Sequence, residues 1–387
     1  MANPPVFDID PDAFWRDPYP ALQEMRATTP IVHVPQLQAT LLTRRDDIFE
    51  CEKNTAVFSS FQPQGLMTTL MGENMMRKDG DAHTSERNQA FPALSPRNVK
   101  AHWREKFIAY TGAILDDIAE RPEIDLVRDY AMPVSANALR EITGLTSMTP
   151  AEMDGASQGM IDGCSNYAGD AAVEARCHAA TAAIDAAIDQ RLPEVSAAPD
   201  FSLLSVLTQA GQNMDSVRAN IKLTISGGQN EPRDAIAGLG WAAMTYPEQF
   251  RKITAGEVTW QQAFEEYARW ISPIGMSPRR IAQAFSYHDI DFEPETRVFL
   301  MFGSANRDDS VFDQPEAFEI TRDTSKAIAF GAGPHFCAGA AASRCLIGEV
   351  AMPMLFQRFP DMNLTGPVEF GGWAFRGPLS VPVALNT

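Results

Sequence analysis

The chain has 387 residues, and 45% of them are hydrophobic, which is ample for a large buried core. Its 50 Asp and Glu residues outnumber its 32 Lys and Arg residues, giving a formal net charge of −18. So acidic a chain is poorly suited to nucleic acid or to anionic membranes, and we expect neither as a partner. The N-terminal MANPPVFDIDPDAFW has no basic region followed by an apolar run, and no segment is apolar over the thickness of a bilayer. These features predict a soluble, cytoplasmic protein.

Cysteine and histidine usage excludes two further classes of protein. The five cysteines are odd in number and form no CxxC pair, and the six histidines are scattered without an HExxH motif. Neither a disulfide framework nor a structural zinc site fits this pattern. We therefore expect any metal to arrive inside a cofactor.

Hydrophobic patterns along the chain predict a mainly α protein with a minor β part. Residues 11–28 end in a short amphipathic helix, 31–45 alternate like a β-hairpin, and 55–80 have the composition of a long irregular loop. Helical patterns follow at 83–188 (broken by Pro92, Pro96 and Pro150), 203–211, 215–245, 247–253 and 259–270. Short strands are expected at 279–300, then a helix of about 20 residues after Gly339, and a final strand in LSVPVAL. The elements do not alternate as βαβ units and no linker marks a boundary, so we expect one domain over 1–387.

The central helical pattern is interrupted by SGGQNEPRDA, residues 226–235. Gly227, Gly228 and Pro232 each lower helix stability, and Pro232 also removes a backbone donor. The interruption indicates either two helices joined by a turn or one helix opened beside a ligand.

A single cysteine stands out by its surroundings, in AFGAGPHFCAGAAASRCLIGEV at 329–350. Cys337 precedes a helical run of small residues, where free backbone N–H groups and the helix dipole stabilise a thiolate. Gly331 and Gly333 permit a tight turn, and Gly339 permits close approach of the backbone to a flat ligand. For the other four cysteines we accept a buried structural role.

FGAGPHFCAG resembles the haem-binding loop of the cytochrome P450 family, FGxGxHxCxG, at every fixed position. The resemblance implies a P450 fold, a triangular prism of helices with small β-sheets, and haem b as cofactor. It makes Cys337 the thiolate ligand of the iron, a ligand that favours O–O cleavage. It also places Phe330 near the sulfur and His335 at a haem propionate, and it makes Gly331 and Gly339 part of the cofactor-binding loop.

Other motifs of that family occur in order along the chain. EEYARWISP resembles the ExxR helix, with Glu266 and Arg269 on one helical face. Arg280, in the following PRRIA, and His83 with Arg87, in HTSER, match positions that bind propionates. The segment 305–318 resembles the meander before the haem loop, but Ala317 stands where the family often has arginine. Either Arg307 or Arg322 then completes the network around Glu266 and Arg269.

In the same family the broken central helix crosses the distal face of the haem and carries an acid–alcohol pair. Aligning Gly228 with the family glycine puts Asn230 at the acid position and Glu231 at the alcohol position, so threonine is absent. Either Glu231 supplies protons itself, because burial raises a carboxyl pKa, or oxygen activation is weakened and peroxide serves as oxidant. The remaining alternative is that Glu231 points away and pairs with Arg233 or Lys222.

The distal motif resembles that of bacterial P450s that O-demethylate guaiacol- or syringol-type phenols. The segment FGGWAFRGPLSV also resembles their C-terminal loop, which makes Phe375 a substrate contact; for Trp373 a core position is an equal alternative. The other residues expected to line an apolar pocket are Ile225, Gly227, Ile274, Gly275, Met276, Met67 and Leu70. No Arg or Ser in that set demands a carboxylate, so a methoxyphenol is preferred to a methoxybenzoate.

The implied reaction uses O2 and electrons from a ferredoxin with its reductase, or from a fused iron–sulfur flavin reductase using NAD(P)H. Arg344, Arg97 and Lys100 are candidates for contact with an acidic partner, although each is individually explained as ordinary surface charge. Three alternatives stay open: a hydroxylase of a terpene, fatty acid or natural product, driven by O2 or by peroxide; a nitric-oxide reductase type; and a haem-thiolate binder without catalytic activity.

Overall fold

The structure is a computed structural model that describes residues 3–166 and 169–386. Residue contacts divide it into two compact units, each built from several stretches of the chain. Unit 1 comprises 1–62, 245–337 and 368–379, and unit 2 comprises 63–244, 338–367 and 380–387. The single domain expected over 1–387 stays a prediction.

Unit 1 contains the larger sheet and the helices that pack on it. Its helices are α1 (Pro11–Arg16), α2 (Tyr19–Thr28), α3 (Arg45–Lys53), α14 (Pro247–Thr254), α15 (Trp260–Ile271) and α16 (Phe302–Ala305). Its strands are β1 (Ile31–Val34), β2 (Ala39–Leu42), β3 (Phe58–Ser59), β5 (Ser277–Ile281), β6 (Phe285–Tyr287), β7 (Ile290–Phe292), β8 (Arg297–Leu300), β10 (Phe370–Gly371) and β11 (Gly377–Pro378).

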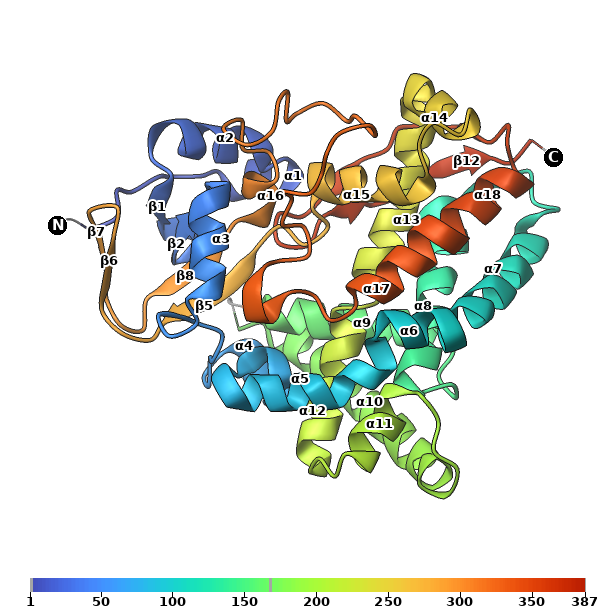
Figure 1. The fold of residues 1–387 in the computed structure, drawn as a ribbon, viewed down its shortest axis with the longest axis horizontal. Coiled ribbons are helices and arrows are strands. Elements are labelled where there is room, and N and C mark those ends of the chain that lie inside the picture. The colour runs from blue at the N-terminus through green and yellow to red at the C-terminus, as the bar shows by residue number, and fades with distance from the viewer. Residues whose placement is uncertain (1–2, 167–168, 387) are drawn as a thin grey trace. The chain divides into compact units, whose positions relative to one another are not determined.

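The main sheet has the order β1-β2-β8-β5-β3, in which β2 and β8 are parallel and the other pairs are antiparallel. The predicted hairpin is confirmed as β1 and β2, which pair from Ile31 with Leu42 to Val34 with Ala39. Figure 1 shows α3 lying against this sheet. Ile48 and Cys51 of α3 belong to the same buried apolar cluster as Leu41, Ile281 and other sheet residues. Burial of this cluster anchors α3, whose last turn faces the cysteine loop described below.

Unit 2 is mostly helical. Its helices are α4 (Leu66–Met71), α5 (Gly80–Leu94), α6 (Pro96–Asn98), α7 (Arg104–Ile118), α8 (Met132–Thr143), α9 (Pro150–Cys164), α10 (Ala171–Ala197), α11 (Leu203–Gln209), α12 (Met214–Ser226), α13 (Asn230–Thr245), α17 (Ala340–Arg344) and α18 (Met352–Arg358). A π-helical stretch, Cys345–Ala351, joins α17 to α18, and this long helix runs along α7 (Figure 1). The strands β4 (Glu123–Asp125), β12 (Pro382–Ala384) and β9 (Asn363–Leu364) form a small antiparallel sheet.

Two details of the predicted element order are wrong. The loop expected at 55–80 contains β3 and α4, because the apolar residues of α4 pack against α9 despite their Gly- and Gln-rich flanks. Pro92 does not break its helix: it lies in the last turn of α5, which ends at Leu94. Pro96 and Pro150 begin α6 and α9, where a missing N–H costs no helical hydrogen bond.

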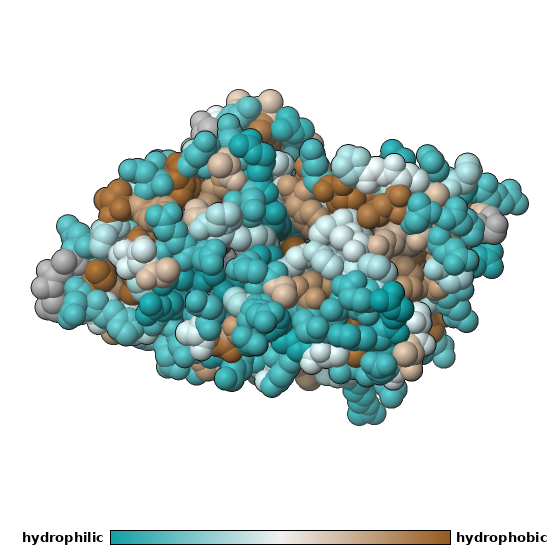
Figure 2. Space-filling view, turned by 90° about the horizontal axis from the view of Figure 1, so that it is seen from above, coloured by the Kyte–Doolittle hydropathy of each residue, from teal (hydrophilic) through white to brown (hydrophobic). Residues whose placement is uncertain are grey.

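The surface is mainly hydrophilic on the face that is drawn. Figure 2 shows a face on which hydrophilic residues predominate and apolar residues gather in separate groups. No helix within 3–166 and 169–386 is both long enough and apolar enough to cross a bilayer.

Candidate active site

The loop that carries Cys337 closes on itself in unit 1. The Cys337 N–H donates to the Phe330 carbonyl at 2.9 Å, and the Gly331 N–H donates to the Ile328 carbonyl at 2.9 Å. Gly331 and Gly333 have φ values of +70° and +61°, which side chains other than glycine rarely adopt. The turn therefore requires these glycines, as the sequence predicted. Cys337 is half-buried, and Gly339 is the N-cap residue of α17 in unit 2.

The backbone of this loop rests on a buried carboxylate that the sequence did not single out. Glu52, in the last turn of α3, accepts a hydrogen bond from the Ala332 N–H at 3.1 Å and pairs with Arg279 of β5. A Cβ atom added at Gly331 would lie 3.3 Å from Oε2 of Glu52. Only the fold reveals the three-way contact, because 52, 279 and 332 are far apart in the chain.

Arg279 and Arg280 are neighbours on β5 and their side chains make different contacts. Arg280, the predicted propionate ligand, pairs with Glu295 and donates to the Phe61 carbonyl at 2.8 Å. Arg279 is only 2% exposed, and its Nε has no hydrogen-bond partner among the residues the structure describes. A buried guanidinium N–H without a partner is costly, and an anionic cofactor carboxylate would satisfy it.

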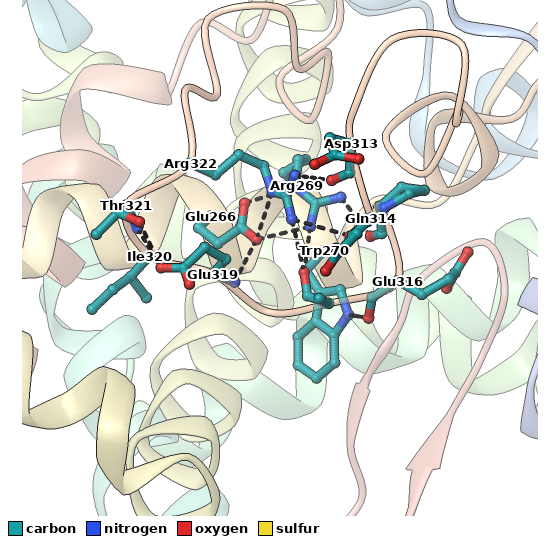
Figure 3. Close-up of polar contacts among 12 residues, drawn as sticks. Glu266, Arg269, Trp270, Asp313, Gln314, Glu316, Glu319, Ile320, Thr321 and Arg322 are labelled. Atoms are coloured by element: carbon teal, nitrogen blue, oxygen red, sulfur yellow. Dashed lines mark hydrogen bonds and ion pairs between the residues drawn. The ribbon is translucent and has the colours of Figure 1, made fainter.

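The predicted pair of Glu266 and Arg269 is present on α15, where both side chains are completely buried (Figure 3). Arg269 donates to both carboxylate oxygens of Glu266, at 2.7 and 2.8 Å, and to the carbonyls of Asn306, Pro315 and Ala317. Oδ1 of Asn306 in turn accepts the Ile328 N–H at 2.8 Å. The pair thus holds the meander and, through Asn306, the start of the cysteine loop.

The structure decides which arginine completes this network. Arg322 lies with its Nε 3.2 Å from Oε1 of Glu266, as Figure 3 shows, while Arg307 pairs with Glu316 and donates to the Trp270 carbonyl. Arg322 is therefore the third member, and Arg307 is not. The carbonyl of Ala317, the residue that departs from the family pattern, accepts from both Arg269 and Arg322.

In unit 2, His83 and Arg87 lie four residues apart on α5, as predicted. His83 is buried and Arg87 is half-buried. A buried imidazole one turn from a guanidinium gives α5 two hydrogen-bond donors on one face, which suits carboxylate binding.

The predicted interruption of the central helix is confirmed, and it falls at residues 227–229, between α12 and α13. A Cβ at Gly228 would lie 2.5 Å from the Thr224 carbonyl oxygen, so this position requires glycine. The donor that Pro232 removes is not missed: Pro232 lies in the first turn of α13, where no N–H is needed, and the next residue, Arg233, donates to the Gln229 carbonyl.

Side chains of α8 and α9 hold the interruption in place. Ser157 Oγ donates to the Ile225 carbonyl at 3.1 Å, and Ser135 Oγ donates to the Gln229 carbonyl at 2.7 Å. Asp154 Oδ1 accepts from Gln229 Nε2 at 2.9 Å and from Arg233 Nη1 at 3.0 Å. Carbonyl groups that lose helical partners are thereby satisfied, and both sides of the break are tied to α9.

Glu231 begins this second helix with a shielded carboxyl group. Neither of its carboxylate oxygens is accessible to solvent or accepts a hydrogen bond from another described residue. Burial raises the pKa of Glu231 from 4.5 to about 7, with a smaller contribution from Asp234. Pairing with Arg233 or Lys222 is wrong, since Arg233 pairs with Asp154 and Asp234, and Lys222 pairs with Asp185. The geometry leaves a carboxyl group able to gain or lose a proton near neutral pH.

Asn230, at the predicted acid position, is buried and bonded to α9. Its amide contacts Ser157 Oγ and Gln158 Oε1, both at 3.3 Å. These contacts fix Asn230 in a neutral network, so the predicted acid position carries no titratable side chain.

Part of the expected pocket comes together in unit 1. Ile274 and Phe375 form an antiparallel bridge, and the Gly275 N–H donates to the Ala374 carbonyl at 2.9 Å. Met276 lies two residues beyond Ile274 and packs with it against the sheet cluster. Trp373 is half-buried and packs against the same cluster, where its ring contacts Phe14 and Phe299.

The remaining predicted lining residues belong to unit 2. Ile225 is fully buried in the last turn of α12, next to Gly227. Met67 and Leu70 lie on α4, which packs against both α9 and α12, and Leu70 lies against Gly163. The positively charged residues suggested for partner contact include the exposed Arg97 and Lys100 and the half-buried Arg344.

Comparisons with known proteins point to one family of enzymes. The family model "Cytochrome P450" matches residues 260–360. Cytochrome P450 107B1 of Saccharopolyspora erythraea is 26% identical, covering 96% of each chain. The epothilone C/D epoxidase of Sorangium cellulosum is 27% identical, covering 99% of this chain and 96% of the epoxidase. The crystal structure of P450BioI with a hexadec-9Z-enoic acid-ligated acyl carrier protein has a TM-score of 0.88 at 20% identity, covering 96% of this chain and 99% of that one, and shows the same fold.

The fold and the cysteine loop define an oxidoreductase of the haem-thiolate class. The chain has the cytochrome P450 fold and is a P450 monooxygenase, an enzyme that binds haem b through a cysteine thiolate. Two observations fit that cofactor: the glycine turns that shape the backbone before Cys337, and the buried, unpartnered Nε of Arg279. Members of the family use O2 and electrons from ferredoxin and reductase partners.

Proposed function

We propose that this monooxygenase O-demethylates a small methoxylated aromatic compound of the guaiacol or syringol type. The observation that carries the proposal is the carboxyl group of Glu231, shielded, unpartnered and with a pKa near 7 at the helix break. It stands where P450s usually have an alcohol, and the sequence around it resembles that of the aromatic O-demethylases.

In this reaction one oxygen atom of O2 enters a C–H bond of the methoxy group. The other oxygen atom leaves as water, with two electrons from NAD(P)H and two protons. In the resulting hemiacetal the bond between the aryl oxygen and the former methyl carbon breaks, the hydroxyl proton passes to the aryl oxygen, and a phenol and formaldehyde are formed. Bound haem supplies the oxidising chemistry, whereas the side chains orient the substrate and supply protons. We assign to Glu231 the transfer of those protons, because a carboxyl group with a pKa near 7 both donates and recovers a proton at neutral pH.

The proposed cofactor-binding residues come mainly from the cysteine loop and from helix α5. Cys337 is the proposed iron ligand, Phe330 packs near its sulfur, and Gly331 and Gly339 allow close approach of the backbone. His83, Arg87 and His335 are proposed to bind the propionates. For the arginine of β5, the free buried Nε favours Arg279 over Arg280, which already has two partners.

The proposed substrate contacts are apolar. The bridge between Ile274 and Phe375 fixes an aromatic ring beside an aliphatic side chain, which suits a small aromatic ligand. The further proposed contacts are Met276, Ile225, Gly227, Met67 and Leu70. Electrons are proposed to come from a ferredoxin with its reductase or from a fused iron–sulfur flavin reductase, with Arg97, Lys100 and Arg344 as contacts.

A second candidate is hydroxylation or epoxidation of a larger natural product. It is favoured by the similarity of the chain to the epothilone C/D epoxidase of Sorangium cellulosum. Titration of the ferric protein with guaiacol and syringol, followed by the Soret band, tests the first proposal. A low-to-high spin shift at micromolar ligand, with formaldehyde equal to NADH consumed, supports demethylation. No shift with either phenol rejects this substrate class, and NADH consumption without any product would favour an idle haem binder.

A further inference from the structure

Glu52 is a buried carboxylate with every oxygen engaged. It is 1% exposed, its Oε1 pairs with Arg279 Nη2, and its Oε2 accepts the Ala332 N–H at 3.1 Å. The backbone of its helix lies equally close to the loop: a Cβ at Gly333 would lie 3.2 Å from the Glu52 carbonyl oxygen and 3.3 Å from Lys53 Cα. The last turn of helix α3 therefore packs directly against the turn before Cys337 and supports it.

The partner of this carboxylate is equally constrained. Nη1 of Arg279 donates to Ser277 Oγ at 2.5 Å and to the Pro278 carbonyl at 2.9 Å, and Nη2 is engaged by Glu52. Nε is the one guanidinium nitrogen left without a partner in the described part of the chain. Because the other two nitrogens are fixed, the direction of the free N–H is fixed as well.

A neutral side chain would satisfy the Ala332 N–H without the cost of burying a charge. Burying an ion pair costs several kcal/mol of desolvation, and such pairs are weak sources of stability. A charge at 52 is explained if it must neutralise and orient Arg279 while it holds the loop. One carboxylate then couples two parts of the cofactor site, the thiolate loop and the arginine of β5.

We propose that Glu52 is a positioning residue for the haem-thiolate site: it fixes the turn before Cys337 and the free N–H of Arg279 together. This inference rests on the proposed ligation by Cys337, and it is independent of the substrate class. Glu52 itself touches neither iron nor substrate in the proposal. It acts through Ala332 and Arg279.

Three variants separate its two contacts. Glu52→Gln keeps an acceptor for the Ala332 N–H but removes the charge opposite Arg279, whereas Glu52→Leu removes both. Glu50→Gln, two residues earlier on α3 and on an exposed side chain paired with Lys53, is the matched control. The probe is carbon monoxide bound to the reduced holoprotein, whose long-wavelength band reports thiolate ligation and whose shorter-wavelength band reports its loss.

We expect the thiolate band to decay about tenfold faster in Glu52→Leu than in Glu50→Gln, with Glu52→Gln between them. We also expect the reduction potential to rise in Glu52→Gln, since a negative charge is lost, a change that a purely structural role would not produce. Equal decay rates and equal potentials in Glu52→Gln and Glu50→Gln would overturn the proposal, even if Glu52→Leu fails to fold. If the native protein itself lacks the thiolate band, both the ligation by Cys337 and the role of Glu52 are rejected. If the protein has the band but does not demethylate guaiacol or syringol, the proposed substrate class is rejected and the role of Glu52 is unaffected.

Discussion

Nε of Arg322 lies 3.2 Å from Oε1 of Glu266, a carboxylate whose two oxygens are already held by Arg269. Arg322 also donates to the carbonyls of Asp313, Gln314 and Ala317 (Figure 3). The meander is thus tied to α15 by an arginine that comes after it in the chain, which compensates for alanine at 317.

Replacing Arg322 with alanine is expected to lower the free energy of unfolding by about 2 kcal/mol, because a buried carboxylate loses a charged donor. Urea denaturation of the holoprotein measures the change. Arg358→Ala, which removes an exposed pair with Asp116, is the control and is expected to cost under about 0.5 kcal/mol. An equal loss of unfolding free energy in the two variants would show that Arg322 does not stabilise the network around Glu266.

Asp154 gives a second prediction, because one of its oxygens ties Gln229, in the helix break, to Arg233 in the helix that follows. Asp154→Ala is expected to destabilise the protein by about 2 kcal/mol, since Gln229 and Arg233 lose a shared acceptor. Asp154→Asn keeps an acceptor and is expected to cost less. Thermal unfolding checks both against Asp117→Ala, which removes an exposed ion pair with Arg121. If Asp154→Ala lowers stability no more than Asp117→Ala does, Asp154 does not hold the helix break.

Local patterns were sufficient to predict the cysteine turn and the helix break, because both depend on glycines and on residues adjacent in sequence. The pair of Glu266 and Arg269 was likewise visible as a spacing on one helix. Glu52, Arg279 and Asp154 were missed, since each acts through contacts to residues far away in the chain. Two neighbouring arginines on a strand also could not be distinguished by sequence: only the pairing of β5 shows that Arg280 meets Phe61 while Arg279 meets α3.

Gly275 gives a third prediction, on the bridge between Ile274 and Phe375. A Cβ at Gly275 would lie 2.0 Å from the Trp373 carbonyl oxygen, so Gly275→Ala must push the Phe375 loop away. We expect a loss of about 1–3 kcal/mol of stability and a guaiacol affinity at least about tenfold weaker in the Soret titration. Gly155→Ala, on α9 with no atom near its Cβ, is expected to leave affinity unchanged. Unaltered guaiacol binding in Gly275→Ala would remove Phe375 from the substrate contacts.

Glu231 links stability and turnover to pH. Its folded pKa of about 7 lies above the ordinary 4.5, so the folded state favours the protonated form and loses stability as the pH rises between these values. Glu231→Gln is therefore expected to match the native protein in stability at low pH and to exceed it by up to about 3 kcal/mol well above pH 7. Urea denaturation across this range measures the difference, with the exposed Glu120→Gln as the matched control for removal of a carboxylate. A difference independent of pH would mean that the carboxyl group is not buried in solution.

The same carboxyl group should decide which oxidant the protein uses. Turnover with NADH needs two protons, whereas peroxide brings its own, so loss of the acid should harm the first reaction more than the second. Glu231→Gln is expected to lower NADH-driven formaldehyde release by about tenfold or more and to change peroxide-driven release by less than about threefold. Glu231→Thr restores the alcohol usual in the family and is expected to recover part of the NADH-driven rate. Unchanged rates with both oxidants in both variants would show that Glu231 transfers no proton in the reaction.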